Sequence, residues 1–304
     1  MILRLGTRGS RLALVQCEEV AAALRARGVE TETVVIRTSG DRLAQVALAD
    51  FGGKALFVKE IEEALLARTV DVGVHSLKDM PAELPAGLAL AAFPAREDPR
   101  DALLTRAPGG WSALPAGASV GTSSLRRRAM VLARRADLRA EPIRGNVETR
   151  IDKLSAGAYD GIVLALAGLR RLGVAPPHVL PLGVDEFVPA VGQGVLAIEA
   201  READREVLEL LSRLDDTRSR SEALAERAFL RRLGAGCHTP VAGHAHSEGR
   251  ALTLTGVVTS LDGATVLRSS AGGSASDAER LGQAVADELL AKGARALLDA
   301  RGNG

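Results

Sequence analysis

The sequence predicts an α/β protein with more than one domain, followed by a small α+β region at the C-terminal end. Short apolar segments alternate with segments whose apolar residues lie four positions apart, a pattern typical of strands and helices in largely parallel sheets. The chain has 304 residues, and a single core stops growing near roughly 250–300 residues. Its 46% hydrophobic and 25% charged content is that of a globular protein.

The first α/β region begins at the N-terminus and extends to residue 95. Ser10 is the expected N-cap of a helix that runs to about residue 27, and Cys17, early in that helix, is expected in the core. A glycine-containing loop is predicted at 38–53. The regular elements are strands at 2–6, 32–37, 70–75 and 88–93 and a second helix at 55–68.

The pattern restarts at residue 100, which predicts a second α/β region over 100–188. Prolines interrupt the end of this region, and no internal repeat is evident in the sequence. The predicted elements are strands at 102–105, 119–121 and 161–164 and helices at 124–135 and 147–156, followed by a strand at 195–199 and a helix at 204–211.

The third region, 217–304, is predicted to be a small α+β domain. It opens with a charged amphipathic helix at 218–233. Alternating leucine and threonine at 252–255 indicate a strand, and Asp262-Gly263 indicates a hairpin turn. Apolar residues four positions apart predict a last helix around 281–289.

Composition excludes several classes of function. The net charge is +1 and aromatic residues make up only 2% of the chain, which disfavours nucleic-acid binding. Only two cysteines are present, so no disulfide framework is expected. No signal-peptide pattern and no run of 18 apolar residues occurs, so the sequence predicts a cytoplasmic protein without membrane segments.

Arginines recur where strands give way to helices, and this recurrence predicts a local anion site. Such junctions combine the ligand-binding edge of an open α/β sheet with the free N–H groups of helix N-termini. Cations are disfavoured there by the helix dipole, so we expect an anion between them. Surface arginines in an arginine-rich protein are the alternative. The residues concerned are Arg8, Arg126, Arg127, Arg144 and Arg150.

Two further segments are candidates for chemistry. Asp79 follows Lys78 at the end of an apolar strand, as a proton shuttle or cation stabiliser would, although a solvated ion pair explains the same pattern. Cys237 lies in a glycine-flanked loop after a helix, where its thiol would be reachable. A packed cysteine, a metal site with nearby histidines and a Cys–His hydrolase remain alternatives, but no CxxC, HExxH, Walker A or GxGxxG pattern occurs.

Taken together, motifs spread over most of the chain resemble the porphobilinogen deaminase (hydroxymethylbilane synthase) family. The resemblance is weakest beyond residue 243. The motifs are GTRGSRLAL at 6–14, GGKALFVKEIE at 52–62, DVGVHSLKDMP at 71–81, REDPRDALL at 96–104, GTSSLRR at 121–127, RGNVETR at 144–150, VGQG at 191–194 and LGAGC at 233–237.

The resemblance implies a fold and an activity. Two α/β domains similar to type II periplasmic binding proteins, 1–95 with 195–213 and 100–188, would precede the C-terminal domain at 217–304. The enzyme would be a cytoplasmic monomer of tetrapyrrole synthesis that joins four porphobilinogen molecules head to tail into 1-hydroxymethylbilane and releases ammonia. A dipyrromethane cofactor, bound through a thioether, would prime the chain, and no metal, nucleic acid or membrane is implied.

The resemblance also implies roles for individual residues. Asp79 would be the catalytic carboxylate and Cys237 the cofactor attachment residue, while Lys54 and Phe57 would belong to a lid. The acetate and propionate groups would be held by Arg8, Lys78, Arg126, Arg127, Arg144, Arg150 and Arg171. Supporting polar contacts would come from Ser10, Ser76, Thr122, Ser123, Ser124, Gly145, Asn146 and Gln193. An anion-binding module on the same fold, without catalysis, is the alternative that the fold leaves open.

Overall fold

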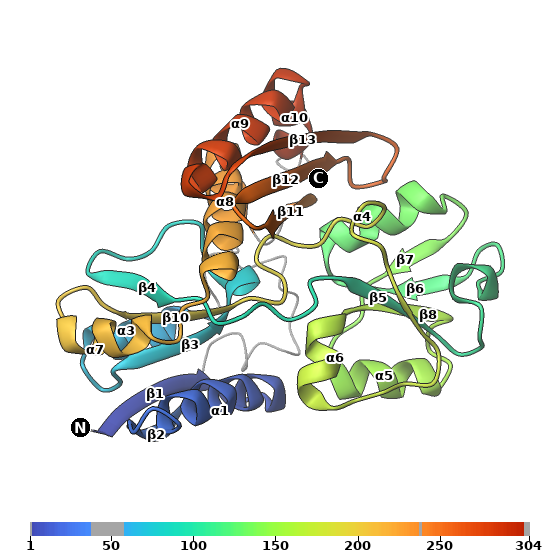
Figure 1. The fold of residues 1–304 in the computed structure, drawn as a ribbon. Helices are drawn as coiled ribbons and strands as arrows, with labels where there is room; N and C mark the ends of the chain where they lie inside the picture. Colours follow the sequence, from blue (N-terminus) through green and yellow to red (C-terminus); the bar gives the residue numbers. More distant parts are fainter. Residues whose placement is uncertain (1, 38–57, 237–238, 301–304) are drawn as a thin grey trace. The chain divides into compact units, whose positions relative to one another are not determined.

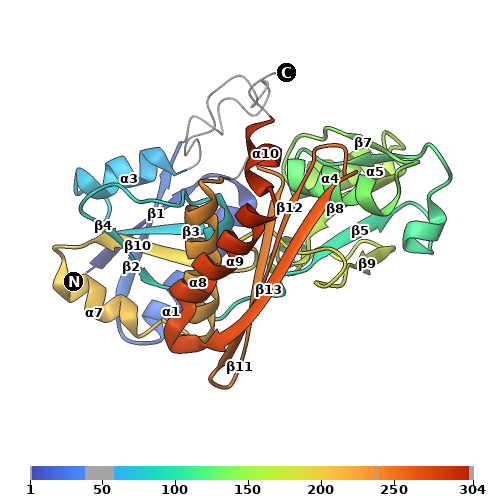
Figure 2. The same cartoon turned by 90° about the horizontal axis from the view of Figure 1, so that it is seen from above.

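The computed structural model describes residues 2–37, 58–236 and 239–300. The chain divides into two compact units (Figures 1 and 2), one made of residues 1–97 and 194–220 and the other of residues 98–193 and 221–304. The first unit is therefore discontinuous in sequence. The second holds the region predicted at 100–188 and all but the first four residues of the region predicted at 217–304, so that finer division stays a prediction.

Among the described residues, the first unit is built around a five-stranded sheet of order β2-β1-β3-β10-β4. The pairs β1–β2 and β1–β3 are parallel, whereas β10 is antiparallel to both of its neighbours. The elements are β1 (Ile2–Arg8), α1 (Arg11–Arg25), β2 (Glu30–Ile36), α3 (Lys59–Leu66), β3 (Val72–Ser76), the 3-10 turn η2 (Leu77–Asp79), β4 (Leu88–Ala92), β10 (Leu196–Arg201) and α7 (Arg205–Ser212).

Helices cover both faces of this sheet because successive strand residues point to opposite sides. Leu3 and Leu5 of β1 face the side where apolar residues of α1 and α7 complete the core, Cys17 among them. On the other side Gly73 admits α3, since a Cβ at that position would lie 3.1 Å from Ile61 Cγ2. The face of β3 that meets α3 therefore carries Gly73 and His75.

The second unit contains a second five-stranded sheet within the described residues, of order β7-β6-β8-β5-β9. Here β5 is antiparallel to both neighbours, while β6 is parallel to β7 and β8. The elements are β5 (Asp101–Thr105), the 3-10 turn η3 (Gly110–Ala113), β6 (Ser119–Gly121), α4 (Leu125–Arg134), β7 (Arg139–Glu141), α5 (Val147–Ser155), β8 (Gly161–Ala165), α6 (Leu166–Leu172) and β9 (Val179–Pro181).

The two sheets share one topology. Within the described residues, each sheet has four strands that run in one direction and one strand that runs the opposite way. When the four are numbered in chain order, the order across each sheet is second, first, third, the reversed strand and fourth. The reversed strand, β10 in one sheet and β5 in the other, follows a crossing of the chain between the two units. The prediction of largely parallel sheets is corrected accordingly to mixed sheets. The two sheets repeat one strand order, although the sequence shows no repeat.

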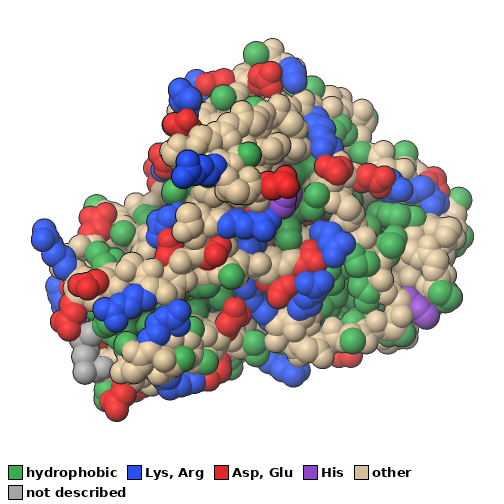
Figure 3. All heavy atoms as spheres, in the orientation of Figure 1, with side chains coloured by type: hydrophobic (Ala, Val, Ile, Leu, Met, Phe, Trp, Pro, Cys, Tyr) green, Lys and Arg blue, Asp and Glu red, His purple; other side chains and the backbone are tan. Residues whose placement is uncertain are grey.

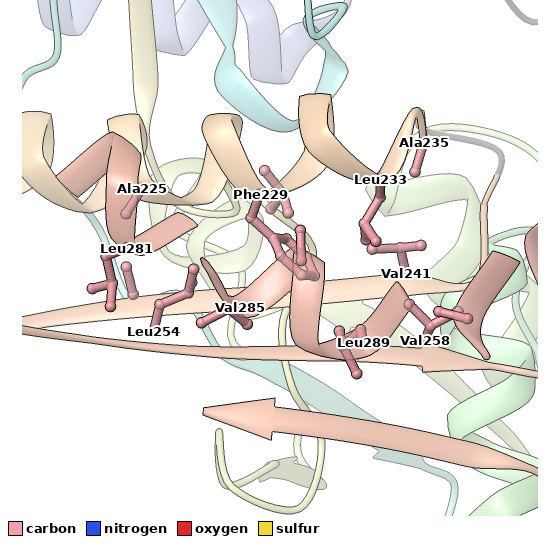
Figure 4. Packing of buried hydrophobic residues seen from close by; sticks show 14 of the residues in the cluster. Ala225, Phe229, Leu233, Ala235, Val241, Leu254, Val258, Leu281, Val285 and Leu289 are labelled. Atoms are coloured by element: carbon pink, nitrogen blue, oxygen red, sulfur yellow. The ribbon is translucent and has the colours of Figure 1, made fainter. Parts of the chain in front are cut away.

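Residues 217–300 add an antiparallel sheet of order β11-β12-β13 with helices packed against it. Phe229, Leu254 and Val285 lie together in its core (Figure 4). Gly256 leaves room for the Phe229 ring, because a Cβ there would lie 2.5 Å from Phe229 Cε2. The elements are α8 (Thr217–Leu233), β11 (Val241–Glu248), β12 (Ala251–Thr259), β13 (Val266–Ser274), the 3-10 turn η4 (Ala275–Asp277), α9 (Ala278–Ala291) and α10 (Ala294–Asp299).

Within the second unit, the hairpin between β12 and β13 contacts α4. Gly263, in the turn predicted from sequence, has a φ of +73°, and a Cβ there would lie 2.5 Å from both Ala129 O and Ala133 N. Val257 of β12 also joins the apolar cluster that contains Met130 of α4. The C-terminal sheet is thus packed directly against the helix that begins with the GTSSLRR motif.

The charged side chains on the visible face are of both signs and interspersed (Figure 3), in keeping with the net charge of +1. A strong cationic field, if present, must therefore be local. Across the parts of the chain that the structure describes, no helix is both long and apolar enough to cross a membrane.

Candidate functional site

The N-terminal end of α4 places two of the predicted arginines in the interior of the second unit. Ser124 is the N-cap, and its Oγ accepts the N–H of Arg127 at 3.3 Å. Arg126 and Arg127 lie on the buried side of the helix and are only 4% and 7% exposed. Two guanidinium groups at a helix N-terminus and away from water require a nearby anion.

That anion is Asp101, the fully buried first residue of β5. Arg126 Nη1 lies 2.7 Å from Asp101 Oδ2, and Arg127 Nη2 lies 2.7 Å from Oδ1. The arginines also donate to the carbonyl oxygens of Val188 and Val163, at 2.8 and 3.1 Å. Burial alone would raise the pKa of Asp101, but the two guanidinium groups lower it to about 2. The carboxylate is therefore ionised throughout the physiological range.

Gln193, in the VGQG motif, completes this cluster. Its Nε2 donates to Asp101 Oδ1 at 3.1 Å and to the carbonyl oxygen of Pro99 at 2.7 Å, while its Oε1 accepts from Arg127 Nη2 at 3.3 Å. Gln193 is only 1% exposed. Within the described residues Gln193 thus contacts Arg127, Asp101 and Pro99 of the protein itself, and its supporting role in ligand binding stays a prediction.

The loop that carries Gln193 is held by a residue of the C-terminal region. Glu226 of α8 is fully buried and accepts the backbone N–H groups of Gly192, at 2.5 Å, and of Ala245, at 2.8 Å. The helix that leads to the LGAGC motif is therefore tied to the residue that precedes Gln193. Sequence reasoning missed Glu226, since an isolated glutamate on a charged helix gives no signal.

Arg150 lies one turn into α5, close to Arg127. Asn146 caps that helix by accepting the N–H of Thr149 at 2.9 Å, and Gly145 has a φ of +110°. Arg150 Nε donates to the Gly145 carbonyl oxygen at 2.8 Å. Burial, and secondly repulsion from Arg127, lower the pKa of Arg150 to about 10. Among the described residues, no carboxylate forms an ion pair with Arg150.

Thr122 and Ser123 shape the approach to α4. Thr122 Oγ1 accepts the N–H of Ser124 at 3.2 Å, and Ser123 Oγ donates to the carbonyl oxygen of Ile143 at 2.6 Å. The second contact joins the GTSSLRR segment to Ile143, which directly precedes the RGNVETR segment. The part of Thr122 and Ser123 in ligand binding stays a prediction.

The remaining predicted cations of this unit, Arg144 and Arg171, are half-buried. The carbonyl oxygen of Arg144 accepts from Lys153 Nζ at 3.0 Å. Arg171 lies in the last turn of α6. Both have interactions within the protein, and their assignment to ligand carboxylates rests on the motif match.

In the first unit, β3 leads directly into the predicted catalytic turn. Gln16 of α1 donates Nε2 to Ser76 Oγ at 2.9 Å, and the Leu77 N–H donates to the Val195 carbonyl oxygen at 3.0 Å. Asp79 and its neighbour Lys78 follow in η2 and are half-buried. The end of β3 is thus fixed by contacts from both α1 and the segment before β10.

Arg8 and Ser10 flank the junction of β1 and α1. Arg8 is the last residue of β1, which extends two residues beyond the strand predicted at 2–6, and it is half-buried. Ser10 is the N-cap of α1, as predicted, and its Oγ accepts the N–H of Ala13 at 3.3 Å. Because the Ser10 hydroxyl accepts this hydrogen bond, its presence is explained by helix capping and does not require a ligand.

Three predicted residues lie outside the described residues: Cys237, Lys54 and Phe57. The cofactor attachment at Cys237 and the lid role of the other two stay predictions. Cys17 is fully buried in the core of the first unit, as expected from its place in the helix. Within the ranges that the structure describes, no group of histidine, cysteine, aspartate and glutamate side chains is arranged to hold a metal ion.

Asp101 is the main residue of this cluster that sequence reasoning did not single out. A signal was present, because an acidic residue directly precedes the apolar run of β5. Its two partners lie 25 and 26 positions further along the chain, so local pattern alone could not connect them.

The arrangement in the second unit can bind anions. Arg126, Arg127 and Arg150 bring three positive charges and Asp101 one negative charge, which leaves an excess of two. Asp101 orients the first two guanidinium groups, and Arg150 supplies a fork without a carboxylate partner in the described residues. A guanidinium in this position suits a bidentate contact with a carboxylate or phosphate.

Two family models match the chain. The first, "Porphobilinogen deaminase, dipyromethane cofactor binding domain", matches residues 3–209, and the second, "Porphobilinogen deaminase, C-terminal domain", matches residues 221–291. The porphobilinogen deaminase of Syntrophobacter fumaroxidans is 50% identical over 300 residues, covering 98% of this chain and 97% of its own length. That of a Roseiflexus species is 50% identical over 298 residues, covering 97% and 98%.

Solved structures with a similar course of the chain include periplasmic binding proteins. The methionine-binding protein MetQ matches with a TM-score of 0.46 at 12% identity, over 70% of this chain and 89% of its own. A periplasmic substrate-binding protein from Coxiella burnetii matches with a TM-score of 0.43 at 16% identity, over 70% and 91%.

Proposed function

Because this chain belongs to the porphobilinogen deaminase family, we propose that it joins four porphobilinogen molecules head to tail into 1-hydroxymethylbilane. Ammonia is released at each addition. The growing chain is held on a dipyrromethane cofactor, whose binding domain covers residues 3–209, through a thioether to Cys237. When bound, the cofactor supplies the pyrrole carbon to which the first substrate is joined.

The excess positive charge around Arg127 and Arg150 is the observation that carries this proposal. Each pyrrole ring of substrate and cofactor bears two carboxylates, so elongation concentrates negative charge. At an effective dielectric of about 20, two unit charges 4 Å apart interact by roughly 4 kcal/mol. A protein with a net charge of +1 can accept such a chain only through local cations.

We assign distinct tasks to the charged residues. Arg126, Arg127 and Arg150 hold acetate and propionate carboxylates, and Asp101 orients the first two guanidinium groups. Arg8, Lys78, Arg144 and Arg171 are further carboxylate contacts on the strength of their motifs. Asp79 stabilises the positive charge left on the substrate when ammonia departs and accepts the pyrrole proton.

Replacing Asp79 by Asn tests the catalytic part of the proposal. The change keeps the shape of the side chain and removes its charge, so kcat should fall by about 100-fold or more while the cofactor stays bound. Glu83→Gln, at an exposed position four residues further on, is the matched control and should leave kcat unchanged. Near-normal turnover in Asp79→Asn would remove Asp79 from the chemistry.

A cytoplasmic monomer is the state that we propose for the enzyme. The proposal rests on the family resemblance and on a composition with only two cysteines, one of them in the core. Light scattering of the purified holoenzyme measures its mass directly. A dimer mass at micromolar concentration would contradict the monomer.

A further inference from the structure

Three titratable side chains meet in the interior of the first unit, apart from the residues already discussed. His75 of β3, Glu199 of β10 and Glu62 of α3 are 5%, 0% and 5% exposed. His75 Nε2 lies 3.0 Å from Glu199 Oε2. Within the described residues, Glu62 Oε1 and Glu199 Oε1 are buried without a hydrogen-bond partner. The cluster joins three elements of the unit.

The sheet is built to admit this cluster. In the antiparallel pair β3–β10, His75 lies opposite Ala197 and Glu199 lies opposite Gly73. The imidazole leans over Gly73 to reach the carboxylate, since a Cβ at position 73 would lie 2.7 Å from His75 Nε2. Any larger residue at 73 would displace the ring, so the glycine and the histidine form one arrangement.

The charges of the cluster cannot all be neutralised by ionic pairing. One imidazole faces two buried carboxylates, and it can balance at most one of them. Burial, and secondly the Glu199 carboxylate, raise the pKa of Glu62 to about 7, although His75 acts in the opposite direction. Glu62 therefore retains its proton under mildly acidic conditions.

The other charged groups on the packed elements leave this balance in place. On α3 itself, Glu63 adds a further upward effect on the pKa of Glu62. Arg201 at the end of β10 donates to the carbonyl oxygens of Leu65 and Val70. On β1, Arg4 pairs with Asp71, and Arg8 is the other charged residue of that strand. Strand β4 carries no titratable residue.

We propose that His75, Glu199 and Glu62 are positioning residues for the catalytic turn. They tie α3 and β10 to the last residues of β3, from which Ser76, Lys78 and Asp79 follow without a break. A buried contact between an imidazole and a carboxylate adds little net stability compared with an apolar contact, but it fixes orientation. The inference rests on the catalytic role proposed for Asp79.

The test uses two variants of the cofactor-loaded enzyme. His75→Gln removes the imidazole, and Glu199→Asp keeps the charge but shortens the side chain, which protects against a failure to fold. Each should lower kcat per loaded protein by about 10- to 100-fold, the cost of misplacing a reacting group. The KM for porphobilinogen should change less than about threefold, because Lys78 is the one carboxylate contact proposed in this turn and the others lie on other elements. His178→Gln, at a half-buried site of the other unit, is the matched control.

The outcomes separate this inference from the proposed function. If both variants keep kcat per loaded protein within twofold of the wild type, whatever their stability, the cluster is only structural and the inference is overturned. An inactive Asp79→Asn beside such normal variants would remove the positioning role alone. Normal turnover in Asp79→Asn would remove the catalytic assignment on which the positioning role depends.

Discussion

Arg127 and Asp101 are joined inside the second unit by two contacts to one carboxylate oxygen, from Nε at 2.9 Å and from Nη2 at 2.7 Å. With Arg126 on the other oxygen, one buried carboxylate orients two guanidinium groups. The pair therefore has a structural task that precedes any ligand, and it leaves positive charge in excess.

Replacing Asp101 by Asn should destabilise the fold. The amide keeps the shape but leaves two buried guanidinium groups without their anion, which costs about 3–5 kcal/mol of unfolding free energy. Urea unfolding at pH 7 measures the loss. Asp137→Asn, which breaks an exposed pair with Arg135, is the control and should have a much smaller effect. Equal losses in the two variants would show that Asp101 does not anchor the arginines.

Replacing Arg150 by Leu should weaken the hold on the growing chain without weakening the fold. Losing one charge-assisted contact costs about 1.5–3 kcal/mol of binding free energy. Native mass spectra during turnover should then show enzyme with fewer than four added rings accumulating. Arg128→Leu, on the exposed side of α4, should behave as wild type. Identical spectra for Arg150→Leu and wild type would exclude a ligand role for Arg150.

Replacing Glu62 by Gln should change how stability depends on pH. The folded-state pKa is about 7 and the ordinary value is 4.5, so between these values the folded protein retains a proton that the unfolded chain has lost. Wild-type unfolding free energy should therefore fall as pH rises from 4.5 to 7, and the variant should not share this fall.

The variant should match the wild type near pH 4.5 and be more stable by about 1–3 kcal/mol at pH 8. Glu63→Gln, on the exposed side of the same helix, keeps Glu62 and should show most of the wild-type fall, because Glu63 has the smallest of the four effects on the pKa of Glu62. Parallel curves for Glu62→Gln and wild type over the whole range would mean that Glu62 has the same pKa in the folded and the unfolded protein.

Much of the fold follows from local pattern. The N-caps Ser10, Ser124 and Asn146 and the turn at Gly263 are encoded within a few residues, and the structure shows the elements that they delimit. The reversal of β5 and β10 was not predictable in this way, because strand direction depends on partners far along the chain.

The charged cluster shows the same limit. The sequence predicts cations at strand-to-helix junctions, and Arg126 and Arg127 are found there. The sequence does not reveal that Asp101 is the carboxylate that pairs with both arginines, since this contact depends on the order of strands in the sheet. Nor does the spacing of His75 and Glu199, 124 residues apart, indicate that they meet.

The central claim is that Cys237 carries the cofactor through a thioether, so that the chain can grow without dissociating. A thiolate is a strong nucleophile near neutral pH, and Gly234 and Gly236 precede Cys237 in the sequence, where residues without a side chain would leave room for the cofactor. The most direct measurement is the intact mass of the active protein, followed by peptide mapping. We predict a mass above that of the sequence by two pyrrole units, located on Cys237 and retained after turnover. An active wild-type protein with the bare sequence mass would contradict the account.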